Sequence, residues 1–257
     1  MKYTLQLFPT AEIPVPCPEV YWMERFSEWT TLQFQAALIR GGDHTILLNT
    51  GFPAEIEALP KAWRDFLGEP AVLQRPDEWL IEAHLEKAGL SPDDITHVLI
   101  TPIQLYATGG LHLFRQADFC FSRRGWIEDI VAPEYPHHVP RQGCISDEHF
   151  HWLMGENRHR LILVPDETEL LPGLRLRWVG THHRSSMAVD VDTAAGRVIL
   201  TDAAFHYANL EEGKPLGIAE SIIEGHAAYD WIRRTADLAI PLYDPLVHQR
   251  HPGGRVA

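Results

Sequence analysis

The chain carries, at residues 100–110, the stretch Ile-Thr-Pro-Ile-Gln-Leu-Tyr-Ala-Thr-Gly-Gly. An apolar run at residues 96–101 leads into it and predicts a strand. Two adjacent glycines, Gly109 and Gly110, close it and predict a turn before the apolar residues 111–114. The stretch is therefore expected to form a loop between a strand and a turn, with Gln104 and Tyr106 among its polar side chains.

Strands and helices are predicted on both sides of this loop. Alternating residues predict a strand at 3–8, and residues 33–40 and 45–50 predict a hairpin. Helices are predicted at 76–89, 123–130 and 220–238, and further strands at 119–121, 161–164, 174–179, 187–191, 197–201 and 239–241. Residues 133–143 hold three prolines and predict a long loop that overhangs a pocket. Strands in both halves, each set followed by helices, predict two sheets with helices outside.

Composition narrows the class of protein. The chain has 257 residues, of which 45% are hydrophobic, and we expect a single domain over residues 1–257. It has no apolar run of about 18 residues and no signal-like start, which predicts a cytoplasmic protein that does not enter a membrane. A net charge of −13 opposes binding to nucleic acid, because phosphates are bound by Lys and Arg. Three scattered cysteines predict reduced thiols.

Seven ordered blocks of the sequence resemble the metallo-β-lactamase superfamily, most closely its N-acyl-homoserine-lactonase-like branch. These blocks are residues 45–52, 91–98, 100–114, 171–182, 196–203, 207–215 and 241–247. The resemblance implies an α/β (α+β) fold, the αββα four-layer sandwich in which helices flank two mixed sheets. It also implies a hydrolase with a small-molecule substrate.

Most of the metal ligands of that family are replaced in this chain. The family loop reads Thr-His-x-His-x-Asp-His, and its histidine and aspartate positions here are Pro102, Gln104, Tyr106 and Ala107. Asn49 and Tyr243 replace two further residues, an aspartate and a histidine, whereas His182 and Asp202 match the family's ligands. One histidine and one aspartate cannot hold two zinc ions. We therefore expect no cofactor, and do not favour a single divalent metal at His182 and Asp202.

The remaining polar residues suggest acid–base chemistry without metal. The resemblance places His182 and Asp202 in one pocket, where the carboxylate can orient the imidazole as a general base. Tyr106, Tyr243 and Gln104 can donate hydrogen bonds to a developing oxyanion. Two alternatives stay open: His182 and Asp202 form a buried hydrogen-bonded pair without function, and the two tyrosine rings only fill volume.

Further residues are predicted to contact the substrate. In related lactonases a tyrosine after the bridging aspartate holds the substrate carbonyl, and Phe205 stands at that position here, followed by His206 and Tyr207. His183 lies beside His182, and adjacent residues of a strand face opposite ways, so the two bind one metal only if the segment is a loop.

Other candidates are set aside. Ser185 and Ser186 lack the Gly-x-Ser-x-Gly elbow of a serine nucleophile. We expect an exposed polar loop for four histidines, which are His137, His138, His149 and His151. We expect core positions rather than an acyl pocket for five aromatic residues, which are Tyr21, Trp22, Phe26, Trp29 and Phe34.

The sequence thus favours a lactonase-like hydrolase that opens a lactone, ester or amide, or performs a related acid–base step, without the dinuclear zinc site. One alternative is a non-catalytic protein that binds a small ligand or a partner. Another is a hydrolase with a relocated single metal. The sequence leaves a homodimer open.

Overall fold

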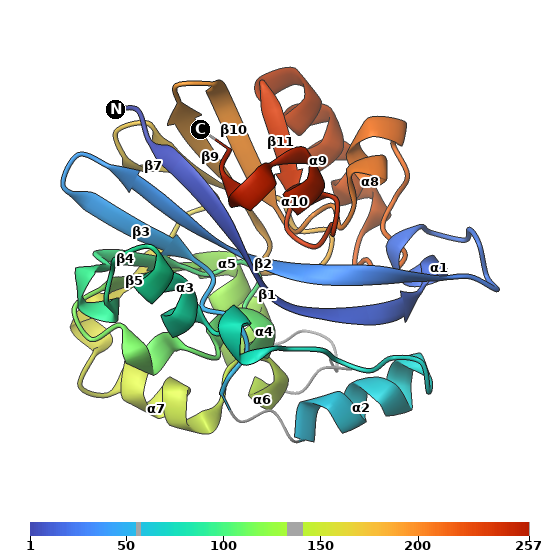
Figure 1. Ribbon diagram of the computed structural model, residues 1–257, viewed down its shortest axis with the longest axis horizontal. Coiled ribbons are helices and arrows are strands. Elements are labelled where there is room, and N and C mark those ends of the chain that lie inside the picture. Colours follow the sequence, from blue (N-terminus) through green and yellow to red (C-terminus); the bar gives the residue numbers. More distant parts are fainter. Residues whose placement is uncertain (55–57, 133–140, 257) are drawn as a thin grey trace.

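Two mixed β-sheets, packed face to face, form the centre of the molecule (Figure 1). The structure is a computed structural model that describes residues 1–54, 58–132 and 141–256. Within them the first sheet has the order β1 (Thr4–Pro16), β2 (Trp29–Gly41), β3 (His44–Leu48), β4 (His97–Leu99), β5 (Asp118–Ser122) and β6 (Leu161–Val164). The second has the order β11 (Leu238–Pro241), β10 (Gly196–Thr201), β9 (Met187–Thr193), β8 (Leu174–Trp178) and β7 (Glu167–Leu171).

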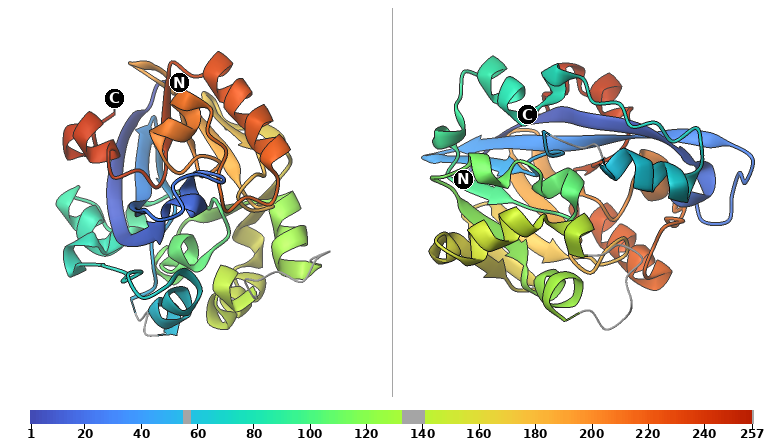
Figure 2. Two further views of the ribbon diagram at one scale, coloured as in Figure 1. Left: turned by 90° about the vertical axis from the view of Figure 1, so that its right-hand side faces the viewer. Right: turned by 90° about the horizontal axis from the view of Figure 1, so that it is seen from below.

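Helices cover the outer faces of both sheets (Figures 1 and 2). The helices of the first part of the chain, including short ones in connecting segments, are α1 (Cys17–Val20), α2 (Ala58–Leu67), η1 (Asp77–Trp79), α3 (Ile81–Lys87), η2 (Pro92–Asp94), α4 (Leu105–Thr108) and η3 (Leu111–Leu113). Next come α5 (Arg123–Gly125), the π-helix η4 (Trp126–Val131), α6 (Arg141–Cys144), α7 (Asp147–Met154) and η5 (Arg158–Arg160). The last are α8 (Tyr207–Glu212), α9 (Ile222–Thr235), α10 (Val247–Arg250) and η6 (Pro252–Gly254). The predicted sandwich of two sheets flanked by helices is confirmed.

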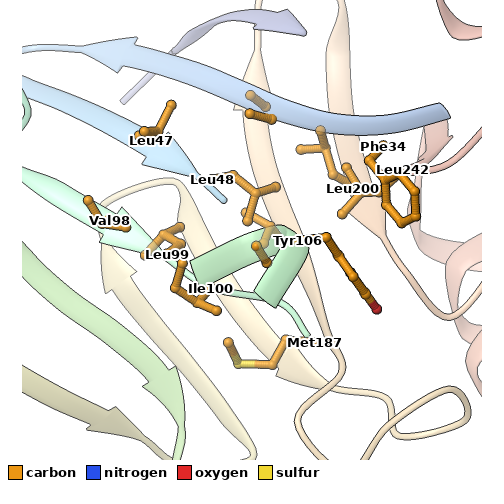
Figure 3. Packing of buried hydrophobic residues seen from close by; sticks show 14 of the residues in the cluster. Phe34, Leu47, Leu48, Val98, Leu99, Ile100, Tyr106, Met187, Leu200 and Leu242 are labelled. Atoms are coloured by element: carbon orange, nitrogen blue, oxygen red, sulfur yellow. The ribbon is translucent and has the colours of Figure 1, made fainter. Parts of the chain in front are cut away.

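The main core lies between the sheets (Figure 3). Leu48 of β3 and Leu99 of β4 face Met187 of β9 and Leu200 of β10, and all four side chains are at most 1% exposed. Burying one such side chain contributes about 1.5–3 kcal/mol. A smaller cluster joins the outer face of the second sheet to α9, through residues such as Ile199 and Ile232.

Some local predictions need correction. The helix predicted at 76–89 is divided into η1 and α3, because Leu80 adopts an extended conformation (φ −62°, ψ 143°) and caps the start of α3. Of the loop predicted at 133–143, residues 133–140 lie outside the described residues, and Arg141 already begins α6. The strand predicted at 3–8 continues to Pro16. Among the described residues, no helix is long and apolar enough to cross a membrane.

The hairpin of β1 and β2 links the two sheets. It extends beyond the first sheet towards α1, as Figure 1 shows. There its backbone bonds to the segment that leaves β11: the amide of Gln33 donates to the carbonyl of Tyr243 (2.9 Å) and the amide of Gln35 donates to that of Leu242 (3.0 Å). The first sheet thereby fixes the backbone of a residue that follows the last strand of the second.

Candidate active site

The candidate site lies where several strands end. Asp202 directly follows β10, and Tyr243 comes two residues after β11. His182 lies in the turn between β8 and β9, and Gln104 is the N-cap residue of α4, which carries Tyr106. These segments come from both sheets, so the site forms only when the sheets pack together.

The loop at 100–110 is fixed by the turn after β3. The side chain of Asn49 grips the backbone of Thr101, since its amide nitrogen donates to the Thr101 carbonyl (2.9 Å) and its oxygen accepts from the Thr101 amide (3.0 Å). Asn49 has a φ of 61°, a conformation that asparagine adopts more readily than most residues. A Cβ on Gly109 would lie 2.0 Å from the backbone nitrogen of Pro53, so only glycine fits there.

Asp202 and His182 form a buried pair at the base of the site. The Nδ1 atom of His182 lies 3.4 Å from Oδ2 of Asp202, and Asp202 is fully buried. Two hydroxyls donate to the carboxylate: that of Thr101 to Oδ1 (2.8 Å) and that of Ser186 to Oδ2. Burial raises the pKa of Asp202 to about 6, and the two hydroxyl hydrogen bonds oppose this shift. The carboxylate is therefore mostly ionised at neutral pH and lies close enough to His182 to influence the orientation of its ring.

His182 and His183 share one turn. Their ring centroids are 4.0 Å apart, and both side chains line the same cavity. The strand geometry that would separate them does not apply, because residues 181–186 form turns between β8 and β9. The Phe205 ring packs edge-on against His182 at 4.6 Å, and His183 lies 3.9 Å from the carboxylate of Glu220.

The rings of Tyr106, Tyr243 and Phe34 pack against one another. The Phe34 centroid lies 4.8 Å from that of Tyr106 and 5.1 Å from that of Tyr243, and the two tyrosine centroids are 6.0 Å apart. Figure 3 shows the side chain of Tyr106 extending from α4, in the same region of the core as Phe34. Burial raises the pKa of both phenols well above the usual value, so both keep their protons. The hydroxyl of Tyr243 makes no hydrogen bond of ordinary geometry to a described residue, but a weaker hydrogen bond with the Tyr106 hydroxyl contributes to the pKa of both phenols.

These groups line a cavity of about 310 Å³. Six of the predicted site residues lie in its wall, namely Gln104, Tyr106, His182, His183, Phe205 and Tyr243. Most of the remaining wall is apolar, and part of it comes from the β1–β2 hairpin, with residues such as Val15 and Leu32. The Gln104 amide nitrogen lies 3.4 Å from the sulfur of Cys144, which positions it in the wall. The arrangement suits a ligand that is mostly apolar and has one polar end.

His206 and Tyr207 lie away from this wall. Nδ1 of His206 pairs with the Tyr21 hydroxyl (2.8 Å) and Nε2 lies 3.0 Å from the carbonyl of Thr31. A carbonyl only accepts, so Nε2 carries the proton and Nδ1 accepts from the tyrosine. The Tyr207 ring packs under Arg250, at 3.8 Å. Neither residue lines the cavity described above, and the predicted contact with substrate stays a prediction.

Part of the cavity wall was not predicted from the sequence. Trp63, Phe66 and Leu67 of α2 line it, and so does Glu19 of α1. Phe66 and Leu67 follow Trp63 by three and four residues, which is the spacing of one helix face, and this signal was present in the sequence. Nothing in the sequence around Glu19 marks it as a cavity residue.

Other sequence expectations have mixed outcomes. His149 is buried on α7, where its Nε2 lies 2.8 Å from Nδ1 of His112, so the prediction of an exposed loop is wrong for it. His137 and His138 lie outside the described residues, and His151 is exposed on α7. Trp22, Phe26 and Trp29 are 40–66% exposed at the hairpin tip, which contradicts the expected core position, whereas Tyr21 and Phe34 are buried.

The donor set does not fit the metal centre of the related fold. The described residues contain no group of three or more His, Cys, Asp or Glu side chains arranged to hold a metal ion. His182 and Asp202 face each other, and both oxygens of Asp202 already accept hydrogen bonds from hydroxyls. Phenol rings occupy two further positions where the resemblance would place ligands. A dinuclear zinc centre needs more carboxylate and imidazole ligands than these.

Solved structures support the fold assignment. Neither a protein-family model nor a curated protein matches the chain. An N-acyl homoserine lactone hydrolase with N-hexanoyl-L-homoserine at its catalytic metal centre is 17% identical, with 97% of each chain covered and a TM-score of 0.79. A quorum-quenching N-acyl homoserine lactone lactonase is 16% identical, with 100% of this chain and 99% of that chain covered and a TM-score of 0.78.

A third structure, from Thermotoga maritima and assigned to the metallo-β-lactamases, is 17% identical. It covers 95% of this chain and 98% of its own, with a TM-score of 0.55. At these identities the likeness concerns the fold, whose first and last strands and both sheets are included in the match. The chain therefore has the metallo-β-lactamase fold, in the form seen in solved N-acyl homoserine lactone hydrolases.

Proposed function

We propose that this protein hydrolyses a small ester or lactone by general acid–base catalysis, with His182 as the base and without the dinuclear metal centre of the related hydrolases. The observation that carries the proposal is the approach of His182 and Asp202, 3.4 Å apart, with His182 in the wall of a mostly apolar cavity. The fold likeness to lactone hydrolases supports the same reaction class.

The pair places an imidazole beside a carboxylate. We expect Asp202 to favour the tautomer of His182 with its proton on Nδ1, so that Nε2 is the basic nitrogen. Nε2 takes a proton from water as the water oxygen bonds to the substrate carbonyl carbon. The resulting imidazolium then gives this proton to the leaving oxygen as the carbon–oxygen bond breaks. Asp202 is a positioning residue in this scheme, because it acts through His182.

Hydrogen-bond donors lie in the same wall. The phenols of Tyr106 and Tyr243 remain protonated, since burial raises the pKa of each, and a protonated phenol can donate to an oxyanion. The side-chain amide of Gln104 is a third donor in the cavity wall. Such a donor typically contributes a factor of about 100 or more to the rate when it reaches the developing charge.

The cavity also limits the substrate. Its volume of about 310 Å³ is at the lower end of the usual range for small-molecule sites. Phe34, Trp63 and Ile218 give it an apolar surface, which suits an acyl chain or an aromatic acyl group. We therefore expect a neutral carbonyl group bound near His182 and apolar parts of the substrate against Phe34, Trp63 and Ile218.

A second candidate is a binding protein that does not turn its ligand over. The close packing of Phe205 on His182, at 4.6 Å, favours it, because this ring covers part of the imidazole that a water would have to reach. A relocated single metal has less support, because the described residues offer no cluster of three ligands.

The test is a turnover screen with metal analysis. Protein purified without chelators is assayed on lactones and esters of increasing chain length, before and after treatment with a chelator. We expect activity that the chelator does not change and that His182→Ala lowers at least 100-fold. His159→Ala, on the exposed η5 segment, serves as the control. Activity that follows a stoichiometric metal, or an unaltered rate in His182→Ala, would contradict the proposal.

A further inference from the structure

Among the residues that the structure describes, Glu19 is the one carboxylate in the cavity wall. It lies on α1, and the Ile218 amide donates to its backbone carbonyl (2.9 Å), which fixes α1 against residues 215–218. The residue is partly buried and shares the wall with the apolar side chains of Val15 and Ile218. A carboxylate placed in such a wall loses part of its hydration, which is unfavourable unless another group replaces the water.

Within the described residues nothing compensates Glu19. Its carboxylate makes no hydrogen bond or ion pair there, and burial alone raises its pKa. Two cations of this part of the molecule are engaged by other acids. Arg25 pairs with Glu28 (3.6 Å), and Lys214 pairs with Glu24 (3.1 Å). Its carboxylate is thus accessible to a ligand in the cavity.

We propose that Glu19 selects substrates that carry a positively charged nitrogen, held at the hairpin side of the cavity while the carbonyl group lies near His182. That such a ligand is a substrate rests on the proposed hydrolysis, whereas its binding to Glu19 does not. A cation brought to a carboxylate of low hydration gains a charge-assisted contact, which a neutral group of the same shape does not gain.

Two further features favour a cationic ligand. The rings of Phe34 and Trp63 line the same cavity, and the faces of aromatic rings attract organic cations. The chain also has a formal net charge of −13, so its long-range field draws cations and repels anions. An anionic ligand such as a fatty acid would be repelled both by Glu19 in the cavity and by the net negative charge of the protein.

The experiment uses matched, non-hydrolysable probes. Two ethers of equal length, one ending in a trimethylammonium group and one in a tert-butyl group, are titrated by calorimetry against the wild type and against Glu19→Gln. A third ether that ends in a primary amide tests whether a neutral donor suffices. The matched control is Glu28→Gln, which removes the same charge from an exposed pair outside the cavity wall.

We expect the wild type to bind the ammonium ether at least tenfold more tightly than the tert-butyl and amide ethers. Glu19→Gln should lower that ratio by roughly tenfold and leave the affinity for the tert-butyl ether unchanged, since the coulombic attraction between a partly buried carboxylate and a quaternary cation is worth about a factor of ten or more. Glu28→Gln should keep the ratio within about twofold, because an exposed charge is largely screened.

Equal affinity of the wild type for the ammonium and tert-butyl ethers, equal affinity for the amide ether, or an unchanged ratio in Glu19→Gln would overturn the proposal. Failure to bind any of the three ethers would overturn it as well. Esters that carry the same end groups as the ethers separate the two inferences. If the ammonium ester binds preferentially but is not hydrolysed, the hydrolase proposal is refuted and the role of Glu19 stands. If the esters are hydrolysed without such a preference, the role of Glu19 is refuted and the hydrolase proposal stands.

Discussion

The hydroxyl of Tyr243 provides a test in which stability and activity change in opposite directions. It is buried, the residue is 1% exposed, and no hydrogen bond of ordinary geometry joins it to a described residue. Its one near polar neighbour is the Tyr106 hydroxyl, and a poorly aligned contact recovers little of the lost hydration, which costs about 1–3 kcal/mol. Tyr243→Phe removes only this oxygen and keeps the ring that packs on Phe34 and Phe205.

We therefore expect Tyr243→Phe to raise the free energy of unfolding by about 1 kcal/mol, measured by urea titration, and the melting temperature by about 2–4 °C. If the hydroxyl donates to the oxyanion, the same change lowers turnover roughly 100-fold. A site whose polar group destabilises the folded state but stabilises the transition state shows this combination.

Tyr3→Phe is the matched control. The Tyr3 hydroxyl donates to the carbonyl of Pro172 (3.2 Å), far from the cavity wall, so its loss should cost about 1 kcal/mol and leave turnover unchanged. The reasoning is refuted if Tyr243→Phe destabilises the protein as much as Tyr3→Phe does. Stabilisation with full activity would instead show that the ring only fills volume.

Three other predictions concern the same site. Burial raises the pKa of Asp202 from 3.8 to about 6, so the folded state binds this proton more tightly than the unfolded state does. Protonation of Asp202 therefore adds about 3 kcal/mol to the free energy of unfolding below about pH 4, and this contribution is lost as the pH rises through 6. Urea titrations over this range should show a weaker dependence of stability on pH in Asp202→Asn. Asn49→Ala removes both hydrogen bonds to Thr101 and should cost about 2–4 kcal/mol in the same measurement, whereas a loss below 0.5 kcal/mol would argue against the clamp. Trp63→Ala should weaken the binding of an apolar ligand roughly tenfold in calorimetry, with little loss of stability because Trp63 is only partly buried, and unchanged affinity would remove α2 from the site.

Periodicity and family blocks located most of the fold. Residues 161–164 and 197–201, for example, alternate or run apolar as strands of a sandwich do, and the structure places β6 and β10 there. The division of residues 76–89 was not predictable, because Leu80 suits a helix and only its extended backbone breaks the pattern. Helix propensity is a weak local preference that tertiary packing overrides.

The candidate site was predictable where residues follow family blocks. His182 and Asp202 came from such blocks, and the structure brings them within 3.4 Å. His206 and Tyr207 followed the same reasoning, but their neighbours Tyr21 and Arg250 come from distant segments that no local pattern links to them. The place of Glu19 in the cavity wall follows only from the position of α1 in the folded structure, since a single glutamate carries no periodic signal in the sequence.

The two backbone hydrogen bonds from β2 to the segment after β11 give the cavity a mechanical property. The amides of Gln33 and Gln35 hold the backbone of Tyr243 and Leu242, so the hairpin cannot lift from the second sheet without breaking both bonds. Access to the cavity by that route would expose these amides to solvent together. Their rates of hydrogen exchange would then report how often the cavity opens, and a bound ligand that closes it should slow both amides equally.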